Sequence, residues 1–366
     1  MSQTGSDRTV EANGYRPGFD GLRAIAVSLV WLCHLRAPGF ANGALGVDIF
    51  FVLSGYLITG VLAEEYRRNG RIDLRNFYIR RVLRLTPALW LLFMATLCWY
   101  AVEPRIRPGL LGATMVSASY LMNWNRIFYW AGEGFLGHTW SLSIEEQFYL
   151  LFPVALILLP RRYWIGIALI AAAASATWLI SLGFSGAAIG RIYNGLDCRM
   201  AGLLLGAGCT LLGQSVRARL APYLPATGVA AVVGMSLLLF LSAMQHPKEF
   251  ALFTVVASLL AALLIIAVDG GWCRRALSLK PIVELGRYSY GVYLWHYPLI
   301  VVVTFYRLSA PWLLATIPAT LIVASLSFHF VERPILRLKT RFECRGRAEL
   351  EPMQAIEGGL APVPAA

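Results

Sequence analysis

Arg23 and His34 stand eleven residues apart in the first strongly apolar segment of the chain, RAIAVSLVWLCH. In a helix, a rise of about 1.5 Å and a turn of about 100° per residue put both side chains on one face, roughly 16 Å apart along the axis. Because ionisable groups are costly deep in a bilayer, a buried His in the company of Asp20 and Arg23 predicts a functional site. The alternative is a lone polar residue satisfied by a neighbouring helix.

The composition is that of a polytopic membrane protein. Of the 366 residues, 58% are hydrophobic and 14% are charged, and the mean hydropathy of +0.61 lies outside the range of soluble proteins. A stretch at 108–123 is interrupted by Pro and Asn, so we expect a partly buried or re-entrant helix there. We expect an all-α membrane protein of about ten transmembrane helices. The apolar stretches lie near residues 22–38, 43–63, 86–102, 146–160, 163–182, 199–213, 222–243, 250–268, 288–307 and 311–331.

The basic residues indicate the orientation. If the ten stretches cross in turn, most of the 32 Lys and Arg residues fall on one side, seven of them arginines within 67–85. The positive-inside rule then places both termini in the cytoplasm of a bacterial-type cell, with the multi-pass chain in its inner membrane. The net charge of +12 is explained by this topology and by contact with the lipid bilayer, and it gives no reason to expect nucleic acid.

A single membrane domain is expected. It would occupy residues 21–338, between a cytoplasmic segment at 1–20 and a disordered cytoplasmic tail at 339–366, which is rich in charge and then in Pro, Gly and Ala. Because the first twenty residues are polar, we expect no cleavable signal peptide and take the first span as the insertion signal. The six cysteines are scattered without a C-x-x-C pair, so neither a disulfide framework nor a metal site is expected.

Arg81 and Arg84 form an R-x-x-R pattern at the predicted membrane boundary. At this spacing on a helix both side chains point the same way. Guanidinium groups bind phosphates through paired hydrogen bonds, so two of them at a cytoplasmic mouth suit a nucleotide-bearing acyl carrier. The other arginines of this loop are explained by topology alone.

Two acids and a serine are further candidates, each with a structural alternative. Asp48, on the predicted outer side of the second stretch, could orient His34 as the acid of a hydrolase triad does, or simply favour a helix N-terminus. Glu145, at the predicted outer entrance of the fourth stretch, could hold an acceptor hydroxyl, pair with an arginine such as Arg199, or cap its helix. Ser54 precedes a glycine; such a small pair favours helix packing over a role as nucleophile.

His296 lies in the ninth apolar stretch, two residues before Pro298. A proline inside a helix frees a backbone carbonyl and commonly kinks the helix. An inward-facing His296 beside the kink could line the same cavity as His34, with Tyr293 one turn below. A structural hydrogen bond from His296 to an exposed carbonyl is an equal alternative.

Six blocks of the sequence, in order, resemble acyltransferase family 3, the integral membrane O-acyltransferases that use acyl-CoA. The resemblance runs from about residue 18 to 335. It implies that Arg23 and His34 are the family's signature pair, with His34 as catalytic base, and it marks Glu145 and the R-x-x-R; we group Arg23 with Arg81 and Arg84 for cofactor binding. The blocks are GFDGLRAIAVSLVWLCH, LGVDIFFVLSGYLITGVL, NFYIRRVLRLTP, TWSLSIEEQFYLLFP, SYGVYLWHYP and HFVERP.

The predicted activity is transfer of an acyl group, most simply acetyl, from acyl-CoA to a hydroxyl of a carbohydrate or another polar acceptor, as in modification of cell-surface polysaccharide or lipopolysaccharide. An imidazole suits this reaction because its pKa lies near neutrality, so it can take the proton of the attacking alcohol. A covalent acyl-His intermediate is also chemically possible. Acetyl-CoA would be a co-substrate, with no permanently bound cofactor. The alternative is a secondary transporter or polysaccharide exporter with an intramembrane His/carboxylate relay.

Overall fold

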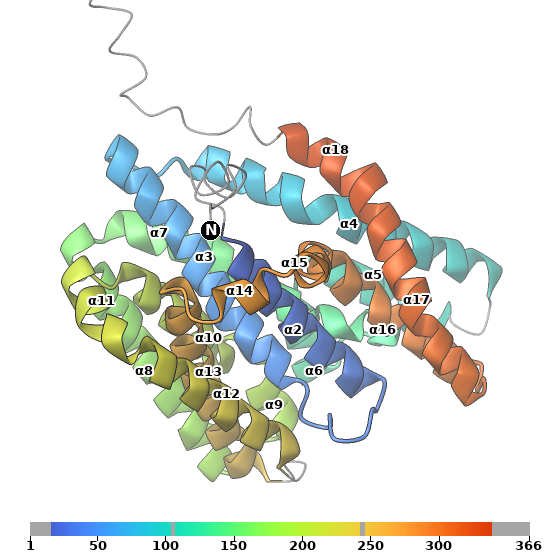
Figure 1. The fold of residues 1–366 in the computed structure, drawn as a ribbon. Helices are drawn as coiled ribbons and strands as arrows, with labels where there is room; N and C mark the ends of the chain where they lie inside the picture. Colours follow the sequence, from blue (N-terminus) through green and yellow to red (C-terminus); the bar gives the residue numbers. More distant parts are fainter. Residues whose placement is uncertain (1–15, 104–106, 242–245, 339–366) are drawn as a thin grey trace, which may run out of the picture.

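A computed structural model of the protein describes residues 16–103, 107–241 and 246–338, and within these ranges all regular secondary structure is helical (Figure 1). The tail expected at 339–366 and most of the segment expected at 1–20 lie outside the described residues. The helices are α2 (Pro17–His34), α3 (Leu45–Asn69), α4 (Leu74–Val102), α5 (Arg107–Ala118), α6 (Met122–Phe128), η2 (Gly134–Thr139), α7 (Trp140–Leu158), η3 (Arg161–Tyr163), α8 (Trp164–Phe184), α9 (Ile189–Asn194), α10 (Leu196–Leu211), α11 (Gln214–Leu220), η4 (Ala221–Tyr223), α12 (Leu224–Phe240), α13 (Pro247–Asp269), α14 (Arg274–Leu277), α15 (Lys280–Arg287), α16 (Ser289–Phe305), α17 (Ala310–Ser327), η5 (Phe328–Glu332) and α18 (Arg333–Leu336).

Seven helical stretches of the described chain are long and apolar enough to cross a membrane, which confirms the all-α membrane class. The remaining three of the ten expected stretches form α2, α10 and α16, which are shorter or more polar. The stretch expected to be re-entrant forms the two short helices α5 and α6. The seven are Leu45–Asn69, Leu74–Val102, Gly134–Leu158, Arg161–Phe184, Gln214–Phe240, Pro247–Asp269 and Ala310–Leu336.

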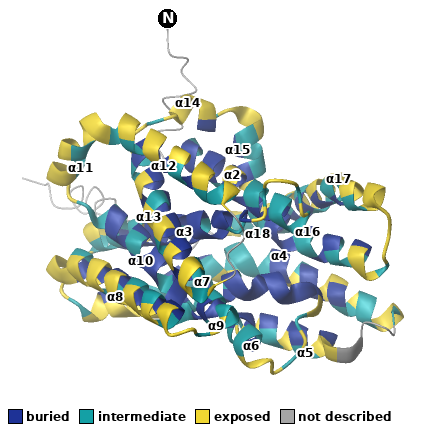
Figure 2. Cartoon of the chain, turned by 90° about the horizontal axis from the view of Figure 1, so that it is seen from below, coloured by how far each residue is buried: buried dark blue, intermediate teal, exposed yellow. Residues whose placement is uncertain are grey.

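Helix α3 lies at the centre of the bundle. Of its most apolar window 72% is buried, against 17% for the stretch containing α12 and 22% for those containing α8 and α17. Figure 2 shows the same contrast, with α3 mostly dark and the outer faces of α8, α12 and α17 largely yellow. Since the exposed faces carry large apolar residues such as Val233, Leu237 and Phe240, the outer helices are suited to contact lipid.

Glycines let α10 cross α3 at very short range. A Cβ at Gly55 would stand 1.8 Å from the carbonyl oxygen of Leu203, and one at Gly206 would stand 1.9 Å from that of Val52. Small residues permit such close approach of helix backbones, where dispersion contacts are gained over a long interface. Gly55, the partner of Ser54 in the Ser-Gly pair, therefore serves packing.

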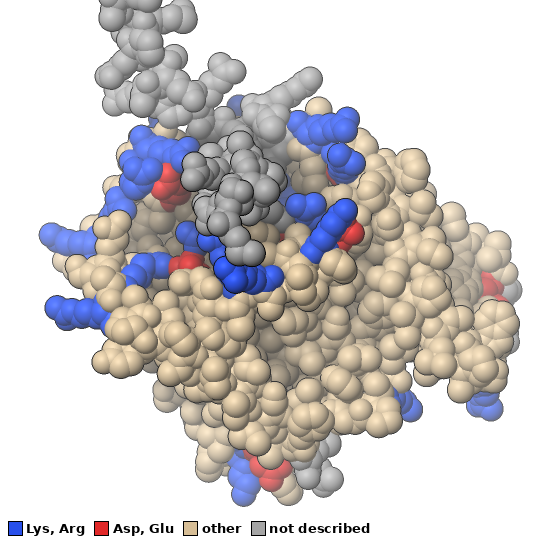
Figure 3. All heavy atoms as spheres, in the orientation of Figure 1, with Lys and Arg blue, Asp and Glu red and all other residues tan. Residues whose placement is uncertain are grey.

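One end of the bundle is strongly basic. Figure 3, in the orientation of Figure 1, shows Lys and Arg side chains gathered over the end that carries α11, α14, α15, α18 and the α3–α4 junction, with a broad uncharged belt below it. We call this end the basic face. The uncharged belt matches the apolar middle of the membrane, and the basic face is the pattern expected of a cytoplasmic surface.

Candidate active site

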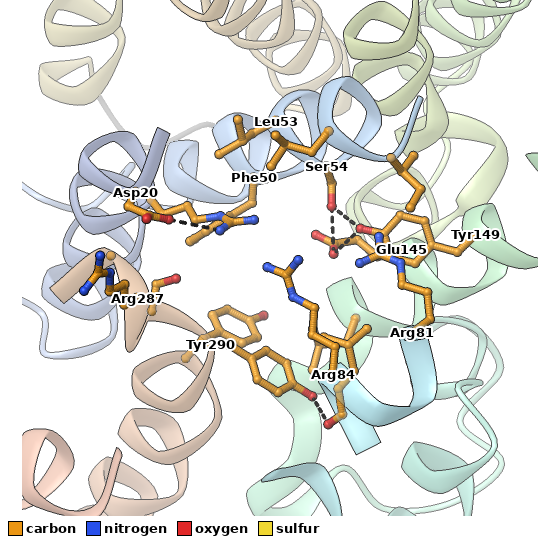
Figure 4. A pocket seen from close by; sticks show the side chains of 18 of the residues that line it. Asp20, Phe50, Leu53, Ser54, Arg81, Arg84, Glu145, Tyr149, Arg287 and Tyr290 are labelled. Carbon is orange, nitrogen blue, oxygen red and sulfur yellow. Dashed lines mark hydrogen bonds and ion pairs between the residues drawn. The ribbon is translucent and has the colours of Figure 1, made fainter. Parts of the chain in front are cut away.

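A cavity of about 450 Å³ lies among α2, α3, α4, α7, α16 and the end of the last long helix (Figure 4). This volume is within the usual range for small-ligand sites. Four of its charged lining residues are arginines, and we call it the arginine cavity. The charged residues that line it are Asp20, Arg23, Arg81, Arg84, Glu145, Arg287 and Glu332.

Two helix starts position the arginines. Helix α2 begins at a proline and has Asp20 in its first turn, where a helix favours a negative charge; Arg23 Nη1 lies 3.2 Å from Asp20 Oδ1. Helix α4 is capped by Asp73, whose side chain accepts a hydrogen bond from the Asn76 amide at 3.1 Å. This start fixes the register by which the R-x-x-R pair reaches the cavity.

The two arginines of that pair have different surroundings. The guanidinium of Arg81 lies 3.8 Å from the centroid of the Tyr149 ring, a cation–π contact. The Arg84 side chain has no hydrogen-bond or ion-pair partner among the residues that the structure describes, and Figure 4 shows it extending into the middle of the cavity. A free guanidinium inside a cavity is available to an anionic ligand.

Glu145 lies in the wall of the same cavity. Its Oε2 accepts hydrogen bonds from Ser54 Oγ and from Tyr149 Oη, both at 3.1 Å, and the two hydroxyls also contact each other. The helix-cap alternative is wrong, because α7 begins at Trp140 and its cap residue has no side-chain cap bond. Glu145 is thus an interior acid on the side of Arg81.

Two other predicted partners are engaged elsewhere. Asp48 does not orient His34; its Oδ1 accepts a 2.9 Å bond from Arg199 Nη2, and the side chains of this pair are only 5% and 2% exposed. The suggested pairing of Arg199 with Glu145 is therefore also replaced. Since a buried charge is tolerated only when paired, we assign the Asp48–Arg199 pair to holding α3 against α10.

His34 lies at the far end of α2 from Arg23, in a group of aromatic and imidazole rings that we call the histidine cluster: His34, His138, Tyr293, His296 and Tyr297. The His34 ring is 5.1 Å from both the His296 and the Tyr297 rings, centroid to centroid. His138 is 5.9 Å from His296 and 5.0 Å from Tyr297. Within the described residues, no such group is arranged to hold a metal ion.

The hydrogen bonds of the cluster fix the tautomers of its two bonded histidines in their neutral forms. His296 Nδ1 lies 3.0 Å from the carbonyl oxygen of Val292, which can only accept, so Nδ1 carries the proton. His296 Nε2 must then accept from His34 Nδ1, 3.0 Å away. The lone pair of His34 Nε2 is left over. An imidazole lone pair of this kind is suited to take a proton from an alcohol.

The arginine cavity and the histidine cluster share one aromatic residue, Tyr293. Tyr293 lines the cavity and lies 5.6 Å from His296, centroid to centroid. Its hydroxyl donates to the carbonyl oxygen of His138 at 2.7 Å, and the hydroxyl of Ser141 lies 2.6 Å from it. Of the predicted residues, the structure therefore joins Arg23, Arg81, Arg84, Glu145, Ser54 and Tyr293 in one cavity, and His34 with His296 in the cluster beyond it.

Several site residues were missed from the sequence. Tyr149 follows Glu145 by one helical turn, so its i+4 spacing was a usable signal. Glu332 lines the cavity and accepts a 2.9 Å bond from Ser327. His138 is 3% exposed in a short 3₁₀ turn, where no apolar periodicity marks a buried position.

These features define an integral membrane protein in which an arginine-lined cavity adjoins a cluster with a hydrogen-bonded histidine pair. A family model described as acyltransferase domain matches residues 16–330. The chain belongs to acyltransferase family 3 and carries the acyltransferase domain of that family, as its sequence blocks predict.

Relatives include the peptidoglycan O-acetyltransferase OatA of Listeria monocytogenes, 35% identical over 352 residues, and the O-acetyltransferase OatA of Staphylococcus aureus, 34% identical over 347. The putative peptidoglycan O-acetyltransferase YrhL of Bacillus subtilis is 35% identical over 347 residues. Each match covers 88% of this chain but only 55–57% of the relative, so the chain spans little more than half the length of these relatives. No solved structure matches the chain.

Proposed function

We propose that the protein is a membrane O-acetyltransferase that moves an acetyl group from acetyl-CoA to a hydroxyl of a cell-envelope glycan. The observation that carries this proposal is the pairing, along one helix, of an arginine-lined cavity with a histidine whose Nε2 lone pair is free. The acetyl group and the glycan are supported by the names of the relatives, two of which are called peptidoglycan O-acetyltransferases. The relatives give no support to a transporter or exporter.

In this proposal the donor enters the arginine cavity from the basic face. Arg23, Arg81 and Arg84 bind the phosphates of acetyl-CoA, and Arg84 contributes a guanidinium without an ion-pair partner among the described residues. Glu145 keeps Arg81 and Tyr149 in place. The pantetheine arm of acetyl-CoA then extends along α2 past Tyr293 and brings the thioester to His34. Acetyl-CoA is consumed as a co-substrate.

The chemistry assigned to the cluster is acyl transfer by general-base catalysis. His34 Nε2 takes the proton of the acceptor hydroxyl while the hydroxyl oxygen forms a bond to the thioester carbonyl carbon. The C–S bond breaks, and the CoA thiolate leaves and receives the proton from His34. His296 keeps His34 in the reactive tautomer. Attack by the same Nε2 on the thioester would give an acyl-imidazole instead, so both routes depend on this lone pair.

We also propose that α2, α10 and α16 cross the membrane with the seven longer stretches, which makes ten spans with both termini in the cytoplasm. The basic face would then be the cytoplasmic face of a bacterial-type inner membrane. Residues 21–338 would form the membrane domain, with α2 starting a little earlier, at Pro17. His34 would lie toward the opposite face, where envelope glycans are found.

The test is binding and turnover of acetyl-CoA by the purified chain in nanodiscs, with a peptidoglycan glycan fragment as acceptor. We compare the wild type with an Arg81→Gln/Arg84→Gln variant and with an Arg71→Gln/Arg75→Gln variant, which loses the same charge from exposed positions outside the cavity. We expect acceptor-dependent release of CoA, and a Kd for acetyl-CoA raised at least about tenfold in the cavity variant alone.

Two results would contradict the proposal. If a folded wild type neither binds nor consumes acetyl-CoA, the enzyme assignment fails. If the exposed-arginine variant loses as much affinity as the cavity variant, the donor binds through general surface charge and the cavity has another ligand. Proton or solute flux across liposomes that is altered in a His34→Ala variant would then favour the transporter.

A further inference from the structure

We infer that Arg126 and Glu133 form the acceptor subsite, which holds hydroxyls of a neutral, hydroxyl-rich glycan beside His34. No family motif singled out these residues in the sequence. The inference rests on the proposed function for the reaction that the glycan undergoes, but the binding itself is independent of it.

The pair is built by a tight turn between α6 and η2. The chain reverses at Tyr129, whose φ of 54° is in the left-handed region. The Asn125 amide clamps the turn, since its Nδ2 donates to the Ala131 carbonyl at 3.0 Å and its Oδ1 accepts from the Ala131 amide at 2.7 Å. The turn brings Glu133 Oε2 to 3.1 Å from Arg126 Nε.

The pair is connected to the reactive histidine through Tyr297. Arg126 is close enough to act electrostatically on His34 and, with Glu133, on Tyr297. Tyr297 in turn lies edge-on to His34 at 5.1 Å. Glu133 Oε2 and the Tyr297 hydroxyl are both within 4 Å of the point where a Cβ on Gly137 would stand. The two polar atoms therefore lie close together, and the missing side chain of Gly137 leaves room for the Glu133 carboxylate.

Exposure separates this pair from the structural ion pairs. The side chains of Asp48 and Arg199 are 5% and 2% exposed, whereas those of Arg126 and Glu133 are 28% and 33% exposed. The partly exposed Arg126–Glu133 pair therefore has polar atoms within reach of a ligand, which the buried Asp48–Arg199 pair does not.

The chemistry of the pair selects a sugar. A carboxylate accepts hydrogen bonds from hydroxyls and a guanidinium donates to hydroxyl oxygens, so a carboxylate–guanidinium pair can hold neighbouring hydroxyls at once. The opposite charges cancel, which favours a neutral ligand over an anion. Cavity arginines for the donor and a neutral pair for the acceptor thus distinguish the two substrates.

The test measures glycan binding without any donor. The probe is the tetramer of N-acetylglucosamine, titrated into nanodisc-embedded protein by calorimetry, for wild type, Arg126→Gln and Glu133→Gln. The matched control is Arg191→Gln, which breaks the Arg191–Asp197 pair of 2.5 Å and similar exposure, 28% and 38%. We expect the probe's Kd to rise about tenfold in the first two variants and to stay unchanged in the control, with the Kd for acetyl-CoA unchanged throughout.

The outcomes separate the two proposals. Absence of probe binding to the wild type, or equal Kd values in wild type and both subsite variants, overturns the subsite. Probe binding that depends on Arg126, in a protein that does not bind acetyl-CoA, sustains the subsite and removes the transferase. If Arg126→Gln does not fold, Arg126→Lys keeps the charge and loses the fork, and a Kd equal to wild type in that variant would overturn the paired-donor role.

Discussion

The two ends of α2 differ in the hydrogen-bonding groups that they offer a ligand. The arginine cavity offers hydrogen-bond donors, because it holds four arginines and the guanidinium of Arg84 has no ion-pair partner in the described chain. The histidine cluster offers an acceptor, because the chain of bonds from Val292 through His296 consumes every other polar atom of the bonded pair and leaves His34 Nε2. One helix therefore carries an anion-binding end and a proton-accepting end, roughly 16 Å apart.

The substitution with the largest expected effect is His34→Gln, in the histidine cluster. If the cluster alone performs the chemistry, turnover of acetyl-CoA should fall about 10³-fold, the usual scale for loss of a general base, while the Kd for acetyl-CoA stays within about twofold of wild type. Single-turnover transfer and equilibrium binding measure the two effects separately. His329→Gln, at an exposed position of η5, is the control. A parallel loss of donor binding would show that the two ends are one site.

The second prediction asks whether Asp48 belongs to either region. Asp48→Asn leaves Arg199 buried without its counter-charge, so we expect a loss of about 3–5 kcal/mol in stability, seen as a lower midpoint of thermal unfolding in detergent. Asp48→Asn/Arg199→Met removes both charges and should recover most of that stability together with turnover. A double variant that is stable but inactive would show that the Asp48–Arg199 pair is needed for catalysis.

The third prediction concerns the hydrogen bond between His296 and His34 within the histidine cluster. His296→Leu removes the acceptor for His34 Nδ1, so the imidazole is free to adopt the other tautomer, and we expect kcat to fall about tenfold with no change in KM for acetyl-CoA. His296→Gln keeps an oxygen that can accept this bond and should retain more of the activity. Steady-state kinetics of the two variants decide the matter: equal losses in Leu and Gln would mean that His296 only packs.

How much of this was predictable depends on the kind of contact. Each of the ten apolar stretches overlaps a helix, and the positions of Arg23 and His34 on one helix follow from spacing alone. Periodicity tells which face a residue occupies but not which helix that face meets. The Asp48–Arg199 and His34–His296 bonds join residues 151 and 262 positions apart, so they depend on helix order in the bundle. The burial of His138 could not be predicted from the sequence, because its short turn has no apolar periodicity.

Ser54→Ala should have the smallest effect and tests the donor end. Ser54 donates to Glu145, but Tyr149 also bonds the same oxygen, so the carboxylate keeps a partner and we expect kcat to change less than about threefold. The control is Ser28→Ala, which loses only a bond to the Ala24 carbonyl of its own helix. Rapid quench with labelled acetyl-CoA measures both turnover and label on the protein. If Ser54 carried the acetyl group, its loss would lower turnover by roughly 10³-fold or more and remove any label, and the chemistry would then belong to the arginine cavity.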